Sequence, residues 1–67
     1  MREFNVHWKK KKSDQVNITF IVAADVETAW KKVLTIKGGV KKIDIIGAQE
    51  INRGEQTEIG EFINYTS

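Results

Sequence analysis

The spacing of apolar residues changes twice along this chain, from a period of two to the period of an α-helix and back to two. The helical pattern lies in residues 25–37, where apolar side chains recur at intervals of three and four residues and form one stripe on a helix. The stripe consists of Val26, Ala29, Trp30, Val33 and Leu34. On both sides of it, apolar and polar residues alternate as they do in β-strands with one buried face. The pattern therefore predicts strands, one amphipathic helix and at least one further strand.

Two predicted strands precede the helix. The apolar face of the first consists of Phe4, Val6 and Trp8. In the second strand an apolar set alternates with Asn17 and Thr19, and we expect this set to face the core. The set is Val16, Ile18, Phe20 and Val22. Ile21 lies out of phase with it, which predicts that the strand is central in the sheet or covered on both faces. Because only a short polar connection around residues 13–14 joins the two strands, we expect an antiparallel hairpin.

The ends of the helix and a strand beyond it are also predicted. Asp25 has the side chain of a helix N-cap, and Gly38-Gly39 supplies the residues that tolerate the left-handed backbone of a C-cap. A third strand follows in residues 41–51. Its alternation breaks at Ile45-Ile46, beside Gly47, which predicts a β-bulge.

These elements predict a single domain, residues 1–67, of the α+β class. We expect a ββαβ(β) order in which an antiparallel sheet carries one amphipathic helix packed on one face. Residues 55–67 are apolar enough for a fourth strand but irregular. Three interpretations stay open for them: a fourth strand, a segment exchanged between subunits, or a loose tail.

A chain of this size buries a core that barely offsets the entropy of folding. It has no Cys and one His, so neither disulfides nor a Cys- or His-based zinc site is expected, and we predict no metal, cofactor or other prosthetic group. We therefore expect a homodimer, in which apolar residues in excess of the core form the interface. The candidate interface residues are Trp8, Ile46, Phe62, Ile63 and Tyr65.

The location of the protein is predicted from what its sequence lacks. No segment approaches the roughly 20 apolar residues of a membrane span, and the amino-terminal residues do not resemble a secretory signal. A chain without Cys fits a reducing compartment. We expect a cytoplasmic protein that has no membrane partner.

Charge is divided unevenly along the chain. Residues 1–42 contain ten Lys and Arg against four acids, a net of +6, whereas residues 43–67 contain one Arg against five acids, a net of −4. Four lysines, Lys9, Lys10, Lys11 and Lys12, lie at the end of the predicted hairpin. Lysines there can contact nucleic-acid phosphates. Alternatively, they guard an edge strand against aggregation, while lysines near the helix end complement its dipole.

The remaining candidate residues do not form a catalytic arrangement. His7 lies on the polar face of a strand with no nucleophile nearby in the sequence, and the acids of the carboxyl-terminal half are scattered. Trp8 beside the lysines resembles the aromatic of a single-strand binder, but it keeps phase with Val6 and is expected in the core or an interface. We do not expect an enzyme. The sequence favours a non-enzymatic macromolecule-binding module, as a homodimeric protein–protein interaction or accessory protein. The alternative is a nucleic-acid-binding domain that uses the lysine hairpin.

Overall fold

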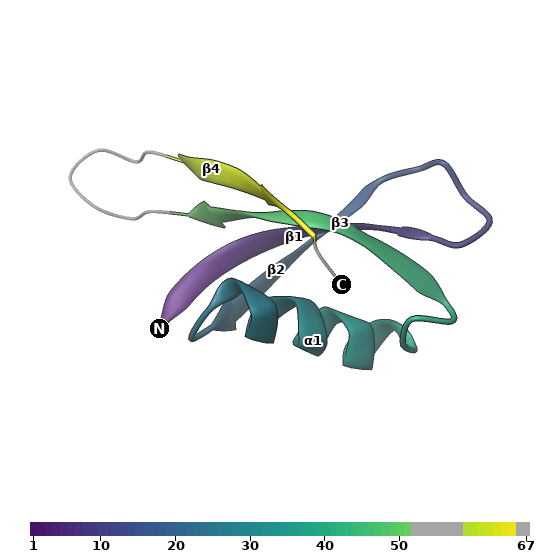
Figure 1. Ribbon diagram of the computed structural model, residues 1–67, viewed down its shortest axis with the longest axis horizontal. Coiled ribbons are helices and arrows are strands. Elements are labelled where there is room, and N and C mark those ends of the chain that lie inside the picture. The colour runs from purple at the N-terminus through teal and green to yellow at the C-terminus, as the bar shows by residue number, and fades with distance from the viewer. Residues whose placement is uncertain (52–58, 66–67) are drawn as a thin grey trace.

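A computed structural model describes residues 1–51 and 59–65 and places one helix across one face of a four-stranded antiparallel sheet (Figure 1). The elements are β1 (Arg2–Lys10), β2 (Asn17–Ala23), α1 (Val26–Lys37), β3 (Ile43–Ile51) and β4 (Ile59–Asn64). The strand order is β2-β1-β3-β4, with every neighbouring pair antiparallel. The predicted α+β class is thus confirmed, and of the three interpretations of residues 55–67 the structure shows a fourth strand, at Ile59–Asn64. Residues 55–58 and 66–67 of the segment 55–67 lie outside the described residues.

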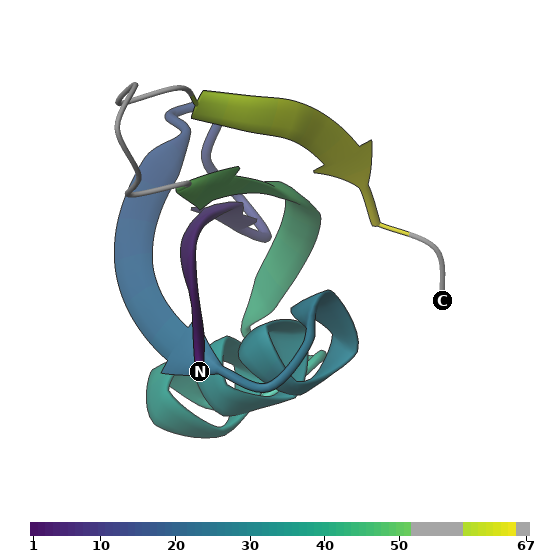
Figure 2. The same cartoon turned by 90° about the vertical axis from the view of Figure 1, so that its left-hand side faces the viewer.

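The core lies between α1 and the inner part of the sheet. Phe4 and Val6 of β1 have no exposed surface, and neither has Val33 of α1. The predicted helix stripe is confirmed, because Ala29, Trp30 and Val33 are buried while Val26 and Leu34 pack against the same cluster. Figure 2 shows the sheet curving around this core, with β4 on the side away from α1.

The predicted orientation of β2 is wrong. The register with β1 places Thr19 beside Val6 and Ile21 beside Phe4, so the residues of this parity face α1. The set predicted for the core is instead exposed. The exposed fractions are 49% for Val16, 59% for Ile18, 47% for Phe20 and 38% for Val22. Nor is β2 central, because it forms one edge of the sheet. A polar contact explains why Thr19 turns inward: its Oγ1 accepts a hydrogen bond from Trp8 Nε1 at 2.8 Å, which satisfies the part-buried indole.

The β-bulge predicted near Gly47 is confirmed. Between His7 and Trp8 of β1, the partner in β3 changes from Gly47 to Ile45, so Ile46 is the extra residue. The carbonyl oxygen of Ile46 accepts a hydrogen bond from the Tyr65 amide at 3.0 Å, just after β4 ends. The bulge therefore helps to anchor the end of the fourth strand.

Both predicted helix caps are present. The Thr28 amide donates to Asp25 Oδ1 at 2.8 Å, and Gly38 adopts a left-handed φ of 105° at the other end. The Gly39 amide also returns to the carbonyl oxygen of Leu34, at 2.6 Å. No helix in the described part of the chain is long and apolar enough to cross a membrane.

Replacement of Asp25 by alanine is expected to lower the melting temperature by a few degrees, because the first helical turn loses its cap. Hydrogen bonds from Thr28 hold the pKa of Asp25 below its ordinary value of about 3.9. The cap therefore stabilises the protein fully above that value, and this stabilisation is lost as pH falls through the lower pKa of the folded state. Thermal melts from pH 2 to pH 7 measure both effects. Asp25→Asn is the control, since asparagine caps equally well but does not titrate. If this variant and the native protein showed equal pH dependence, the pH-dependent stability could not be assigned to the Asp25 cap.

Candidate nucleic-acid interface

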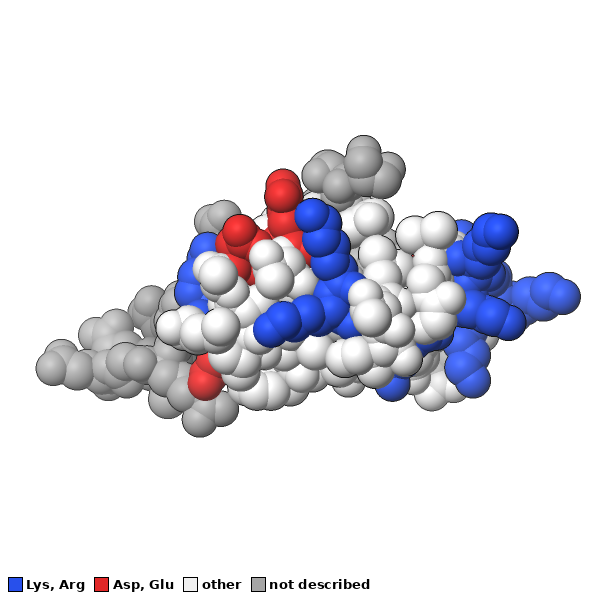
Figure 3. All heavy atoms as spheres, turned by 90° about the horizontal axis from the view of Figure 1, so that it is seen from below, with Lys and Arg blue, Asp and Glu red and all other residues white. Residues whose placement is uncertain are grey.

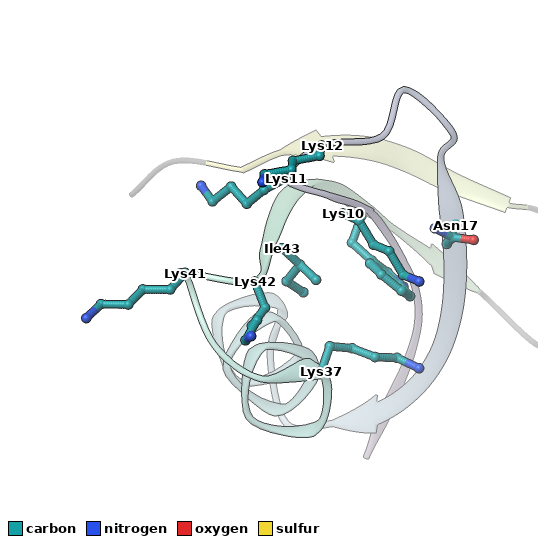
Figure 4. Close-up of a pocket in the computed structure, with 9 residues that line it drawn as sticks. Lys10, Lys11, Lys12, Asn17, Lys37, Lys41, Lys42 and Ile43 are labelled. Atoms are coloured by element: carbon teal, nitrogen blue, oxygen red, sulfur yellow. The ribbon is translucent and has the colours of Figure 1, made fainter.

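Six lysines from three separate segments meet at one end of the molecule. They surround a hollow of about 780 Å³ whose lining also includes Trp8, Asn17 and Ile43 (Figure 4). The six are Lys10, Lys11, Lys12, Lys37, Lys41 and Lys42, and we call them the basic end. Figure 3 shows lysines gathered at this end of the face that α1 covers. The site thus combines the hairpin lysines with the lysines near the end of the helix.

The backbone explains how these segments meet. The Lys11 amide donates to the carbonyl oxygen of Lys42 at 3.2 Å, which ties the turn after β1 to the residues before β3. A tight turn precedes this contact: the amides of Lys42 and Ile43 both donate to the Gly39 carbonyl oxygen, at 3.0 and 3.3 Å. The C-cap of α1 and the register of β1 with β3 therefore fix the basic end.

The floor of the hollow is part of the hydrophobic core. Trp8 is 7% exposed and Ile43 is 3% exposed, so of the two positions predicted for Trp8, core or interface, the structure shows the core. The Nζ of Lys37 lies 5.1 Å from the centroid of the Trp8 ring, within the range of a cation–π contact. The Trp8 ring thus forms the floor of the hollow and contacts Lys37, but it exposes little surface on which a ligand could stack.

The positive charge at this end is mostly uncompensated. Among the side chains that the structure describes, those of residues 1–51 and 62–65, its one ion pair joins Lys11 to Asp44. Elsewhere in the sheet a cation is paired with an acid: Arg2 Nε and Glu50 Oε2 are 2.7 Å apart. The hydrogen bond from Arg2 lowers the pKa of Glu50, so that pair stays ionised. Five lysines of the basic end have no such partner among the described carboxylates.

The structure rearranges the predicted lysine site. Lys9 does not line the hollow, because it is opposite Asp44 and has the reverse parity to Trp8 in β1. The edge-guard interpretation of the hairpin lysines is also wrong, since β1 is a central strand between β2 and β3. Lys37, Lys41 and Lys42, which the sequence associated only with the helix dipole, join the site instead. The signal that could have excluded Lys9 is its alternation with Trp8.

The five candidate interface residues have different environments. Trp8 is buried, while Ile63 and Tyr65 pack against the core cluster of the same subunit. The Tyr65 ring meets that of Trp30 edge-to-face, with centroids 4.9 Å apart. Phe62 is 40% exposed and meets His7 in the same geometry, also at 4.9 Å. Ile46 is half-buried at the bulge.

Comparisons with known proteins leave the site to be interpreted from its own chemistry. A scan of protein-family models and searches of curated proteins and solved structures found no match to this chain. Among the residues that the structure describes, no group of three acidic, His or Cys side chains is arranged to hold a metal ion. What the described chain does offer is a concentrated array of ammonium groups, which is suited to polyanions.

Proposed function

We propose that this protein is a non-enzymatic module that binds nucleic acid by its phosphate backbone through the basic end. The observation that carries the proposal is the convergence of six lysines from three segments around one hollow. Each lysine that neutralises a phosphate releases condensed counterions, and this release drives binding. The sequence suggested two functions, protein binding and nucleic-acid binding. The convergence of the lysines favours nucleic-acid binding.

The side chains of the basic end also set the mode of binding. All its cations are lysines, which act as mobile point charges, whereas base edges are usually recognised by the planar fork of arginine. Trp8 is too buried to stack well on a base. Binding should therefore depend strongly on salt and little on sequence, because phosphate contacts position a protein without specifying bases.

The test replaces three lysines of the basic end that make no contact with Asp44 or the Trp8 ring: Lys12→Gln, Lys41→Gln and Lys42→Gln. Affinity for a single-stranded oligonucleotide should fall about 100-fold at 0.1 M salt, and the slope of log K against log salt should decrease by about 2. On duplex DNA the decrease in slope should be between 2 and 3, since each contact there contributes about 0.9. Fluorescence anisotropy across a salt series measures both quantities.

The chain offers a matched control in its other three lysines. Lys9→Gln, Lys31→Gln and Lys32→Gln together give the same change in net charge, from +2 to −1, outside the basic end. This variant should bind nearly as tightly as the native protein. Equal losses in both triple variants would indicate general electrostatic attraction and contradict a localised site. An acidic peptide that binds more tightly than any oligonucleotide would favour the protein-binding function instead.

A further inference from the structure

The edge strand β2 has no charged residue. Residues 15–24 form a continuous uncharged segment, although charged residues make up 30% of the chain. Proteins usually protect a sheet edge with lysine, proline or a bulge, because an open edge pairs with other strands. The lysines nearest to this edge in sequence lie instead in the turn after β1 and in the central strand.

The exposed side of β2 is also apolar. Val16, Ile18, Phe20 and Val22 form a row on the face away from α1, and each is at least 38% exposed. These residues are β-branched or aromatic, which are the types that stabilise cross-strand pairs. An uncharged edge and an apolar row therefore coincide on one strand.

We infer that β2 is the interface of a two-fold symmetric homodimer, in which it pairs antiparallel with β2 of a second copy. A second copy fits this strand because full overlap of the seven-residue strand with itself places Phe20 on the two-fold axis and Ile18 opposite Val22. Every exposed apolar residue of the strand then faces an apolar residue of the other copy. The two sheets become one continuous sheet with both helices on the same side.

The charges around β2 are compatible with this arrangement. The strand is roughly 24 Å long at about 3.4 Å per residue, so antiparallel pairing keeps the two basic ends more than two Debye lengths apart. The same axis places residue 15 opposite residue 25, which brings the turn that carries Lys12 toward Asp25 and Glu27 of the second copy. The same turn also carries Lys11 and Asp14, so its net charge is +1, which is opposite in sign to that of the two acids at each end of the paired strands.

Within a single chain, the side chain of Lys32 already contacts the open edge of β2. The Nζ of Lys32 donates to the carbonyl oxygen of Val22 at 2.8 Å. Lys32 is exposed, and an exposed lysine is released into water at little cost. Pairing with a second copy would replace this contact with a ladder of backbone hydrogen bonds.

Analytical ultracentrifugation of the full chain should show a dimer that dissociates on dilution. Ile18→Lys together with Phe20→Lys should remove the dimer over the whole concentration range, because the charges added at position 20 would face each other on the axis and those added at position 18 would face the apolar Val22 of the other copy. Ile36→Lys together with Val40→Lys is the control, since both residues are more than 60% exposed and lie outside β2. The control should remain dimeric. A native protein that is monomeric at millimolar concentration, or equal behaviour of the two variants, would overturn the interface.

A single cysteine tests the position of the axis, because the chain has none of its own. Under mild oxidation Phe20→Cys should form a disulfide-linked dimer at least tenfold faster than Val40→Cys, which is on the exposed segment before β3. Equal rates would show that residue 20 is not held beside its copy. If a different protein or a nucleic acid occupied the edge instead, these rates would be equal and the addition of that ligand would protect Phe20→Cys from modification.

Discussion

Replacement of Trp30 by alanine is expected to leave much of the protein unfolded at room temperature. Trp30 is 5% exposed in the middle of the helix stripe, and its ring meets that of Tyr65 edge-to-face. Removal of a buried tryptophan side chain costs about 3–5 kcal/mol in unfolding free energy. At roughly 0.05–0.15 kcal/mol per residue, a domain of this size has only about 3–10 kcal/mol in total. Circular dichroism and urea titration would measure the loss of helix signal and of stability.

Alanine substitutions at two further residues of α1 should destabilise the protein less than Trp30→Ala, so the three variants can be ranked by stability. Leu34→Ala should cost less than Trp30→Ala, because Leu34 is only partly buried against the core. Ile36→Ala should change stability by less than about 0.5 kcal/mol, since the Ile36 side chain is 63% exposed. A melting temperature close to the native value for Trp30→Ala, or a reversed order in the series, would contradict the packing of α1.

The helix could be predicted closely from sequence because its pattern permits one arrangement. The stripe centred on Trp30 has a single apolar side, and Asp25 and Gly38 each have a local backbone role that does not depend on distant contacts. The bulge at Ile46 was likewise visible as a break in alternation beside a glycine. Local chemistry determined each of these features.

The orientation of β2 was not predictable in the same way, because both of its faces carry apolar residues. Val16, Ile18 and Phe20 suggested the core face, yet Ile21 and Ala23 occupy it. Period-two alternation identifies two faces but does not say which one is buried, and a shift of one residue exchanges them. The hydrogen bond between Trp8 and Thr19, which favours the observed orientation, joins two strands and is invisible in either one alone.

The basic end was only half visible in the sequence. The sequence groups Lys10, Lys11 and Lys12 with Lys9 at the end of the predicted hairpin, whereas Lys41 and Lys42 lie near the end of the predicted helix. Their convergence depends on the backbone hydrogen bond from Lys11 to Lys42, a contact across 31 positions of the chain that no local pattern encodes. The types of residue at a binding site were thus available from the sequence, but their association required the register of β1 with β3.

Gly47 lies where β4 approaches β3 too closely for any other residue. A Cβ atom at this position would lie 2.4 Å from the carbonyl oxygen of Ile63 and 2.6 Å from the ring of Phe62. Rotation can move the ring, but the carbonyl belongs to the paired strand, so Gly47→Ala should force β4 away from β3. Such overpacking typically costs about 1–3 kcal/mol. Chemical denaturation would measure this loss against the native protein.

Hydrogen exchange would locate the effect, because β4 pairs with β3 alone and lies at the edge of the sheet. In Gly47→Ala the Tyr65 amide, which donates to Ile46, should exchange faster, while the amides of β1 and β2 should keep their protection. Adding Phe62→Ala separates the two clashes: the double variant should remain destabilised, because the contact with the Ile63 carbonyl persists without the ring. Native stability in the double variant would show that the ring alone requires glycine. Unchanged protection of Tyr65 in Gly47→Ala would mean that β4 does not pack over Gly47, and the position of the fourth strand would then be wrong.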